Sequence, residues 1–242
     1  MTPARLVAFL CSLGLAVGSG LALAQAPVRP SETRAALVIG NARYTAAAPR
    51  PHALNDARAM ARALADAGFA VRTVENADAT ELRRAVGDFA GRVRNVSLAI
   101  LYYSGHAVGR AGKNYLVPVD STPTAPPGEL VGFEELEILI ERAGNTFNLL
   151  ILEGGSRLAF MDPTSGSFRW IAFAAAPGAE AGDDGQHGHY TRALVAQLAT
   201  PGLRIEDVFT RARRAVFTVT GGRQVPWDAS AIDGDFVFVP AR

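Results

Sequence analysis

His106 is the residue of this 242-residue sequence best placed to do chemistry. It follows an apolar run that ends at Tyr103, and the turn Ser104-Gly105 separates the two. A neutral imidazole just beyond a buried strand can take up or release a proton near neutral pH. We expect His106 to reach into a crevice as an acid or base. A histidine that merely hydrogen-bonds its own loop is the alternative.

Two weaker patterns could also supply chemistry. Ser156 follows Gly154-Gly155, but Leu158 stands where a G-x-S-x-G nucleophile elbow needs its last glycine, so a turn serine is favoured. His187 and His189 lie close to two aspartates, and imidazole with carboxylate suits zinc. An exposed loop is the favoured interpretation of that segment. We predict neither a metal nor another cofactor.

Apolar periodicity predicts the strands and helices that position these residues. Strand-like runs cover 34–40, 69–74, 97–103, 147–152, 169–174 and 236–239, and helical spacing covers 54–64, 82–93, 133–143, 190–199 and 205–219. The run 97–103 is nearly continuous, which is typical of a strand buried on both faces of a parallel sheet. A Gly-rich hairpin is expected at 109–114. In open parallel sheets, sites form beyond the carboxyl ends of the strands, where His106 stands.

The first 24 residues differ from the rest of the chain. Arg5 is their only charge, a long apolar stretch follows, and Ala22-Leu23-Ala24 matches a small-x-small cleavage site. We expect a signal peptide (1–24), a polar linker (25–33) and one domain (34–242), exported to the periplasm or secreted. We expect no membrane span in the mature chain. An uncleaved N-terminal anchor is the alternative, because the apolar stretch is long.

Composition argues against several classes of protein. Hydrophobic side chains make up 49% of the sequence, enough to bury one sizeable core. The 24 basic and 23 acidic residues give a net charge of +1, so no global positive field exists to collect nucleic acid. Cys11 is the only cysteine and lies in the expected leader. The mature chain would therefore contain neither a disulfide nor a thiol nucleophile.

Several blocks of the sequence occur together in one known family. They are Leu37-Val38-Ile39-Gly40-Asn41 with Tyr44, Leu54-Asn55-Asp56-Ala57, Tyr102-Tyr103-Ser104-Gly105-His106 followed by 114–120, and Gly222-Arg223-Gln224-Val225-Pro226-Trp227. In this order they resemble the caspase-like peptidases, closest to the bacterial metacaspase and paracaspase branch. The resemblance spans 34–239. It implies an α/β fold, the caspase-like three-layer α/β/α sandwich with a mostly parallel sheet.

The resemblance also implies a mechanism, from which this sequence departs. Family members use a Cys-His dyad, in which the histidine assists a thiolate that attacks a peptide carbonyl. His106 matches the histidine, but the cysteine position falls on Gly155, which has no side chain. Ala107 stands where active members carry a glycine whose backbone N–H helps to hold the oxyanion. We therefore expect no dyad.

An acidic pocket is a further implication of the resemblance. Asp56 and Glu153 match the family's pocket acids, and such a pocket receives an Arg or Lys side chain of a peptide or protein. The alternatives are a helix cap for Asp56 and a solvated strand end for Glu153, which we weigh about equally.

The sequence thus predicts a caspase-like protein that is a catalytically inactive pseudoprotease and binds peptides or proteins. An active hydrolase is the alternative class. It would use His106 with Ser156 as the nucleophile, or a metal held by the loop of His187 and His189.

Overall fold

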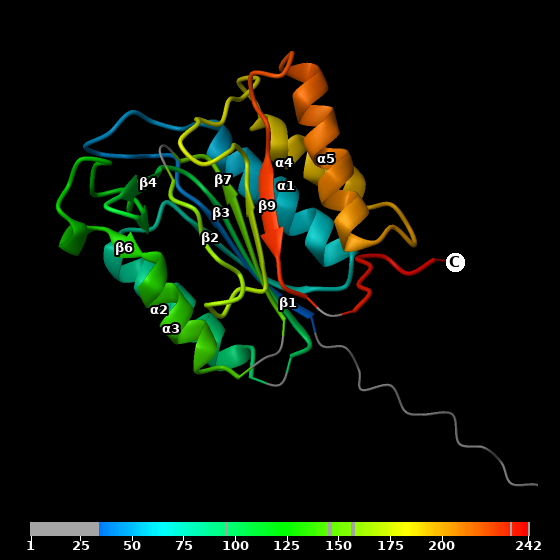
Figure 1. Cartoon of the computed structure of the whole chain (residues 1–242). Helices are drawn as coiled ribbons and strands as arrows, with labels where there is room; N and C mark the ends of the chain where they lie inside the picture. Colours follow the sequence, from blue (N-terminus) through cyan, green and yellow to red (C-terminus); the bar gives the residue numbers. More distant parts are fainter. Residues whose placement is uncertain (1–33, 95, 145–146, 156–157, 233, 242) are drawn as a thin grey trace, which may run out of the picture. The chain divides into compact units, whose positions relative to one another are not determined.

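A six-stranded sheet runs through the middle of the fold, in the order β2-β1-β3-β7-β8-β9 (Figure 1). The computed structural model describes residues 34–94, 96–144, 147–155, 158–232 and 234–241, so the expected signal peptide and linker lie outside the described residues. Neighbouring strands are parallel except β9, which is antiparallel to β8. This confirms the mostly parallel sheet. The strands are β1 (Arg34–Gly40), β2 (Ala70–Glu75), β3 (Leu98–Ser104), β7 (Asn148–Glu153), β8 (Trp170–Phe173) and β9 (Trp227–Ser230).

Strand β3 is buried along its whole length, which explains its unbroken apolar sequence. Leu101 and Tyr103 belong to the hydrophobic core on one face of the sheet, and Ile100 and Tyr102 belong to the core on the other face. Both faces of the sheet therefore need a helical cover.

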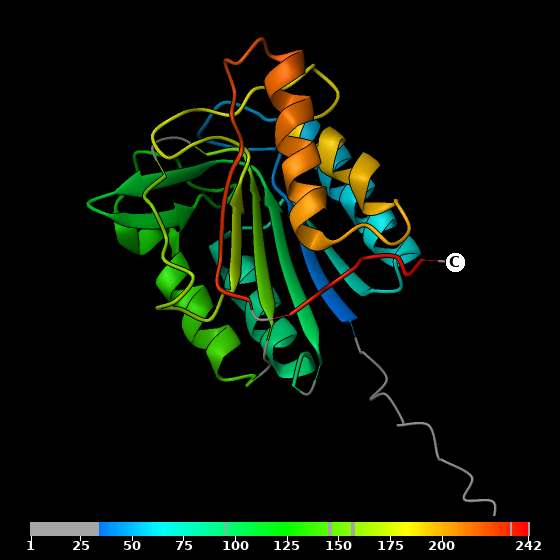
Figure 2. The ribbon, with the colours of Figure 1, turned by 45° about the vertical axis from the view of Figure 1, so that its right-hand side comes forward.

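Two groups of helices provide this cover (Figures 1 and 2). Helices α2 (Ala79–Arg92) and α3 (Phe133–Glu141) pack on one face. Helices α1 (His52–Asp66), α4 (His189–Leu198) and α5 (Ile205–Val219) pack on the other. The result is the three-layer sandwich that the resemblance implied.

A small antiparallel sheet of β4 (Ala107–Arg110), β5 (Lys113–Leu116) and β6 (Val131–Gly132) follows β3 along the chain, with a short 3-10 helix at Pro127–Glu129. Its first two strands form the expected hairpin. Because β4 begins directly after His106, strands fix the chain on both sides of that histidine.

The expected strand at 236–239 is wrong. Val237 and Val239 make only isolated bridges, whereas the last strand of the sheet is β9. The aromatic residues of this segment pack in the core. The ring centroid of Phe238 lies 5.0 Å from that of Phe236 and 6.3 Å from that of Phe69. Only 1% of Phe238 is exposed. The apolar run at 236–239 looks like a strand in the sequence, but it is explained by the packing of its aromatic rings.

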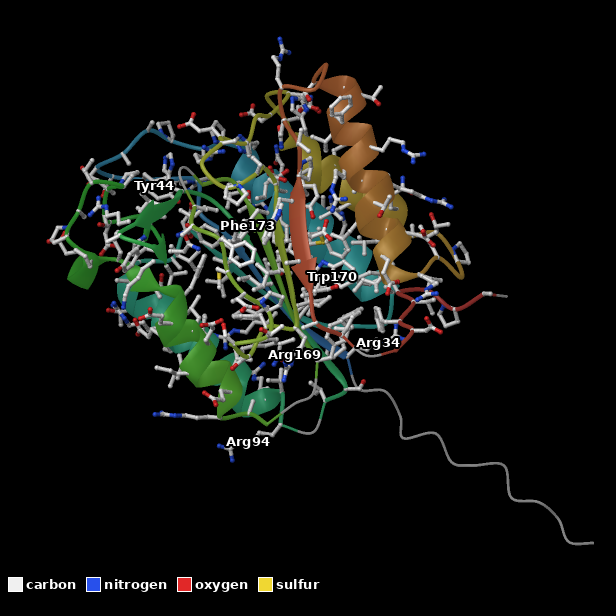
Figure 3. The ribbon with its side chains drawn as sticks, viewed as in Figure 1. Arg34, Tyr44, Arg94, Arg169, Trp170 and Phe173 are labelled. Atoms are coloured by element: carbon white, nitrogen blue, oxygen red, sulfur yellow. The ribbon has the colours of Figure 1, made fainter. Side chains whose placement is uncertain are left out.

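The carboxyl ends of the parallel strands mark one end of the sheet. Figure 3 shows Tyr44, beyond β1, at that end, with Arg34 and Arg169 at the amino ends of β1 and β8. The sheet extends from β1 to β2 on one side and to β3 on the other, and such a reversal opens a crevice outside the strand ends. Within the described ranges no helix is long and apolar enough to cross a membrane.

Candidate active site

His106 is held by two buried tyrosines at the carboxyl end of β3. The Tyr44 hydroxyl accepts a hydrogen bond from the His106 backbone N–H at 2.7 Å, and the Tyr103 hydroxyl donates to the His106 carbonyl at 2.9 Å. A Cβ on Gly105 would lie 2.7 Å from each of the two hydroxyl oxygens, so the close approach requires glycine there. The backbone of His106 is therefore fixed before any ligand arrives.

The imidazole ring of His106 is oriented by contacts on two sides. Its Nε2 lies 2.8 Å from the Ala48 carbonyl oxygen, and its centroid lies 4.5 Å from that of Tyr44. Burial lowers the pKa of His106, and the nearby charge of Arg50 lowers it further. A neutral ring must carry its proton on Nε2 to donate to a carbonyl, which leaves Nδ1 as the basic atom. His106 thus has the state that a general base needs.

Gly155 follows the neighbouring strand β7 and lies beside the histidine segment. Ser104 of β3 pairs in register with Glu153 of β7, so His106 and Gly155 each lie two residues beyond the same rung. A Cβ on Gly155 would lie 3.4 Å from the Cβ of Ala107 and 2.9 Å from a methyl group of Leu158. Position 155 therefore stands beside the histidine segment without a side chain. Ser156 lies outside the described residues.

Asp56 is fully buried on the inner face of α1, where helical spacing places it with Ala53 and Met60. Its Oδ2 accepts from the Ser104 hydroxyl at 3.1 Å, and its Oδ1 lies 3.0 Å from Nδ1 of His187. The Gly188 N–H donates to both oxygens, at 3.1 and 3.3 Å. The helix-cap interpretation is wrong, because Asp56 lies inside α1.

Glu153 is buried at the end of β7, with 1% exposed, so the solvated strand end is also wrong. Its Oε2 accepts from the backbone N–H of Thr191 at 2.6 Å and from the Thr191 hydroxyl at 2.8 Å. Its Oε1 is buried without a hydrogen-bond partner among the described residues.

The two carboxylates meet at the start of helix α4. Asp56 accepts from Gly188, the residue before the helix, and Glu153 accepts from Thr191 in its first turn. The backbone N–H groups at a helix start have no partner within the helix, and together with the helix dipole they favour negative charge there. Burial nevertheless raises the pKa of Asp56 to about 7 and that of Glu153 to about 8, and the charge of Asp56 also raises the pKa of Glu153. The structure thus brings the two predicted pocket acids together.

Arg50, in the loop between β1 and α1, brings a positive charge to this site. Its Nη2 lies 3.3 Å from Nε2 of His52 and would lie 3.4 Å from a Cβ on Gly154. Its Nε is buried and has no hydrogen-bond partner in the described part of the chain. The charge of Arg50 works against the burial that raises the pKa values of both acids. The site therefore holds two acids and one guanidinium.

A family model described as the caspase domain matches residues 33–149 and 163–237, which is most of the chain. The chain belongs to the caspase domain family. The crystal structure of caspase-1 from Spodoptera frugiperda matches with a TM-score of 0.67 and 16% identity, covering 90% of this chain and 98% of that one. At this identity the match shows the caspase fold alone. No curated protein sequence matches the chain.

The caspase domain match is interrupted in one place. It omits residues 150–162, which include the end of β7 and Gly155. The elements on both sides, with His106 and Asp56 among them, lie within the matched segments. The unmatched segment therefore begins within β7 and includes both Glu153 and Gly155.

The two histidines of the metal alternative lie at the start of α4. His187 contacts Asp56, and His189 begins α4 with its backbone N–H bonded to the Gly182 carbonyl. No group of three or more potential metal ligands occurs within the described ranges. The loop 182–186 is exposed, as expected, whereas Gly188 is buried.

Sequence reasoning missed Arg50, Ala48, Thr191 and the contact of His187 with Asp56. Arg50 and Ala48 lie in an Ala- and Pro-rich loop without periodicity, and Thr191 is one polar residue at a helix start. Only His187 gave a signal, as an imidazole beside Gly188, but the sequence does not indicate which distant carboxylate it meets.

Proposed function

We propose that this caspase domain protein binds peptides without cleaving them. The observation that carries the proposal is Gly155, which stands beside the histidine segment where the family places its nucleophile and has no side chain. Residues 34–242 contain no cysteine at all. A neutral, oriented His106 without a thiol to deprotonate supplies half of a dyad.

The rest of the site supports recognition. Tyr44 and Tyr103 still hold the backbone of His106, and the buried acids Asp56 and Glu153 still lie at the strand ends. Buried acids with raised pKa values are typical of functional sites. Nothing in this arrangement depends on a sulfur atom.

Charge favours a basic peptide as the ligand. When both acids are ionised, the two carboxylates lie near the guanidinium of Arg50, and Asp183 adds negative charge near Asp56, so negative charge is in excess. A further cation from a peptide Arg or Lys would balance it. The orphaned Oε1 of Glu153 would accept one of its N–H groups.

Binding and turnover should be measured on the same protein. Titration calorimetry compares an acetylated tripeptide amide that ends in arginine with the same peptide carrying citrulline, the neutral isostere. The proposal expects binding of the arginine peptide only and no cleavage of either peptide. Steady cleavage after arginine would refute the inactive assignment, and equal, negligible heats for both peptides would refute the binding assignment.

A further inference from the structure

The loop 182–188 crosses the candidate pocket and ends on Asp56. His187 places Nδ1 3.0 Å from Oδ1 of Asp56, and 26% of its side chain is exposed while the Asp56 side chain is not exposed at all. His187 therefore lies between a buried carboxylate and solvent. We infer that His187 closes the acidic pocket from within the chain, so that a basic ligand reaches Asp56 only by displacing it.

The carboxylate oxygens of Asp56 show why displacement is required. Oδ1 interacts with His187 and Gly188, and Oδ2 interacts with Ser104 and Gly188. Gly188 and Ser104 are buried, and they belong to the backbone and core that hold the site. The imidazole is the one of these partners that solvent reaches, so it is the partner that a ligand can replace.

The loop is secured at three points along the start of α1. The Asn55 side-chain amide donates to the Gln186 carbonyl at 3.0 Å, and His52 lies 3.5 Å from the Asp183 carboxylate. His187 on Asp56 is the third and innermost point. Within the loop, Asp184 accepts from the backbone N–H groups of Gln186 and His187 at 2.9 and 2.8 Å. The loop tip is therefore a small folded unit, which Arg192 of α4 also holds, with its Nη1 2.6 Å from the Asp184 carboxylate.

The chemistry of the exchange fits a basic side chain. An imidazole offers Asp56 one N–H, whereas a guanidinium offers two in a fork that matches a carboxylate. A peptide arginine would thus gain a bidentate contact where His187 makes a single one. This inference rests on the proposed function for its ligand, but the closed loop itself can be tested without any ligand.

Hydrogen exchange tests the closed loop. His187→Ala removes the contact, and His189→Gln is the matched control, because it alters a histidine two residues away whose ring is not bonded to Asp56. The inference expects the Gly188 amide to exchange about tenfold faster in His187→Ala than in the wild type and unchanged in His189→Gln. Unchanged exchange in His187→Ala, with a normal unfolding transition, would overturn it.

Ligand titration tests the competition. His187→Ala should bind the acetylated arginine tripeptide about tenfold more tightly than the wild type, and His187→Ala with Asp56→Asn should lose that gain. His187→Ala that binds no better than the wild type, while Asp56→Asn still weakens binding, would refute competition but keep the proposed function. Faster exchange in His187→Ala with no binding by any variant would keep the closed loop and refute the proposed function together with the competition.

Discussion

His106 and Gly155 each lie two residues beyond the paired carboxyl ends of neighbouring parallel strands. Because of this register, a histidine that follows β3 and a nucleophile that follows β7 would lie close to each other. Here the oriented imidazole of His106 and the glycine at position 155 follow neighbouring strand ends. Under the proposed function, the protein keeps the scaffold of the site and lacks the nucleophile that His106 would activate.

Peptide cleavage by the purified chain from residue 25 onward should stay at background with Arg and Lys substrates. The reason is the absence of a thiolate opposite His106. Chromogenic arginine and lysine peptides provide the measurement. Turnover that disappears in Ser156→Ala would establish the serine alternative, and turnover that requires zinc and disappears in His187→Ala would establish the metal alternative.

Gly155→Cys alone should not create a peptidase. Gly155 has a φ of 109°, which costs an L residue about 1–3 kcal/mol, and the new Cβ would collide with Leu158. We expect a less stable protein whose thiol is labelled by iodoacetamide without peptide turnover. Gly87→Cys on the outside of α2, where no atom lies within 4 Å of the added Cβ, is the control for labelling alone. Arginine-specific cleavage by Gly155→Cys would contradict this expectation.

Binding of an arginine peptide should depend on both acids and on pH. Asp56→Asn and Glu153→Gln should each weaken it by about tenfold or more. Since a cationic ligand prefers ionised acids with pKa values of about 7 and about 8, affinity should rise with pH through that range. Calorimetry in buffers of different ionisation enthalpy should detect proton release on binding. Affinity that falls as pH rises would exclude these acids as the binding groups.

The free energy of unfolding of the unliganded protein should fall as the pH rises, whereas the affinity for the arginine peptide should rise. Unfolded carboxyl groups titrate near pH 4, whereas the folded-state pKa values of Asp56 and Glu153 are raised. Between these values the folded chain holds protons that the unfolded chain has released, so the free energy of unfolding should fall from about pH 5 to about pH 8. Urea unfolding at several pH values measures this slope. The slope should flatten in Glu153→Gln, and an unaltered slope would contradict the assignment.

The expressed protein should lose its first 24 residues on export. The apolar stretch after Arg5 and the small residues Ala22 and Ala24 are the basis of this proposal. Mass spectrometry of the protein from its native cells would identify the new N-terminus, expected at Gln25. An intact leader in the membrane fraction would favour the anchored alternative.

The fold was largely predictable because local patterns determine it. The apolar run of β3 and the spacing of Leu54, Met60 and Leu64 on α1 each reflect burial against the sheet. The failure at 236–239 has the same origin, since Phe236 and Phe238 are apolar for packing and not for pairing. The pattern of apolar residues indicates which side chains are buried. It does not by itself indicate which segments pair as strands through hydrogen bonds.

The site was predictable only where it follows strand ends. His106, Glu153 and Gly155 come directly after or at the end of buried runs, so the topology gathers them. The partner of Asp56 was not predictable, because His187 lies 131 positions away and meets it through the packing of α4 against α1. A contact of this kind leaves no periodic mark in either segment.

Asp56 and Glu153 accept hydrogen bonds at the start of α4, so both acids have a structural role that does not depend on a ligand. A descendant that abandoned ligand binding would still need both acids to anchor that helix, so selection for stability alone would retain them. The side chain of His187 secures the loop 182–188 and makes no hydrogen bond to the first turn of α4 among the described contacts. Among related chains, the presence or absence of a histidine at position 187 should therefore say more about ligand binding than the presence of the two acids.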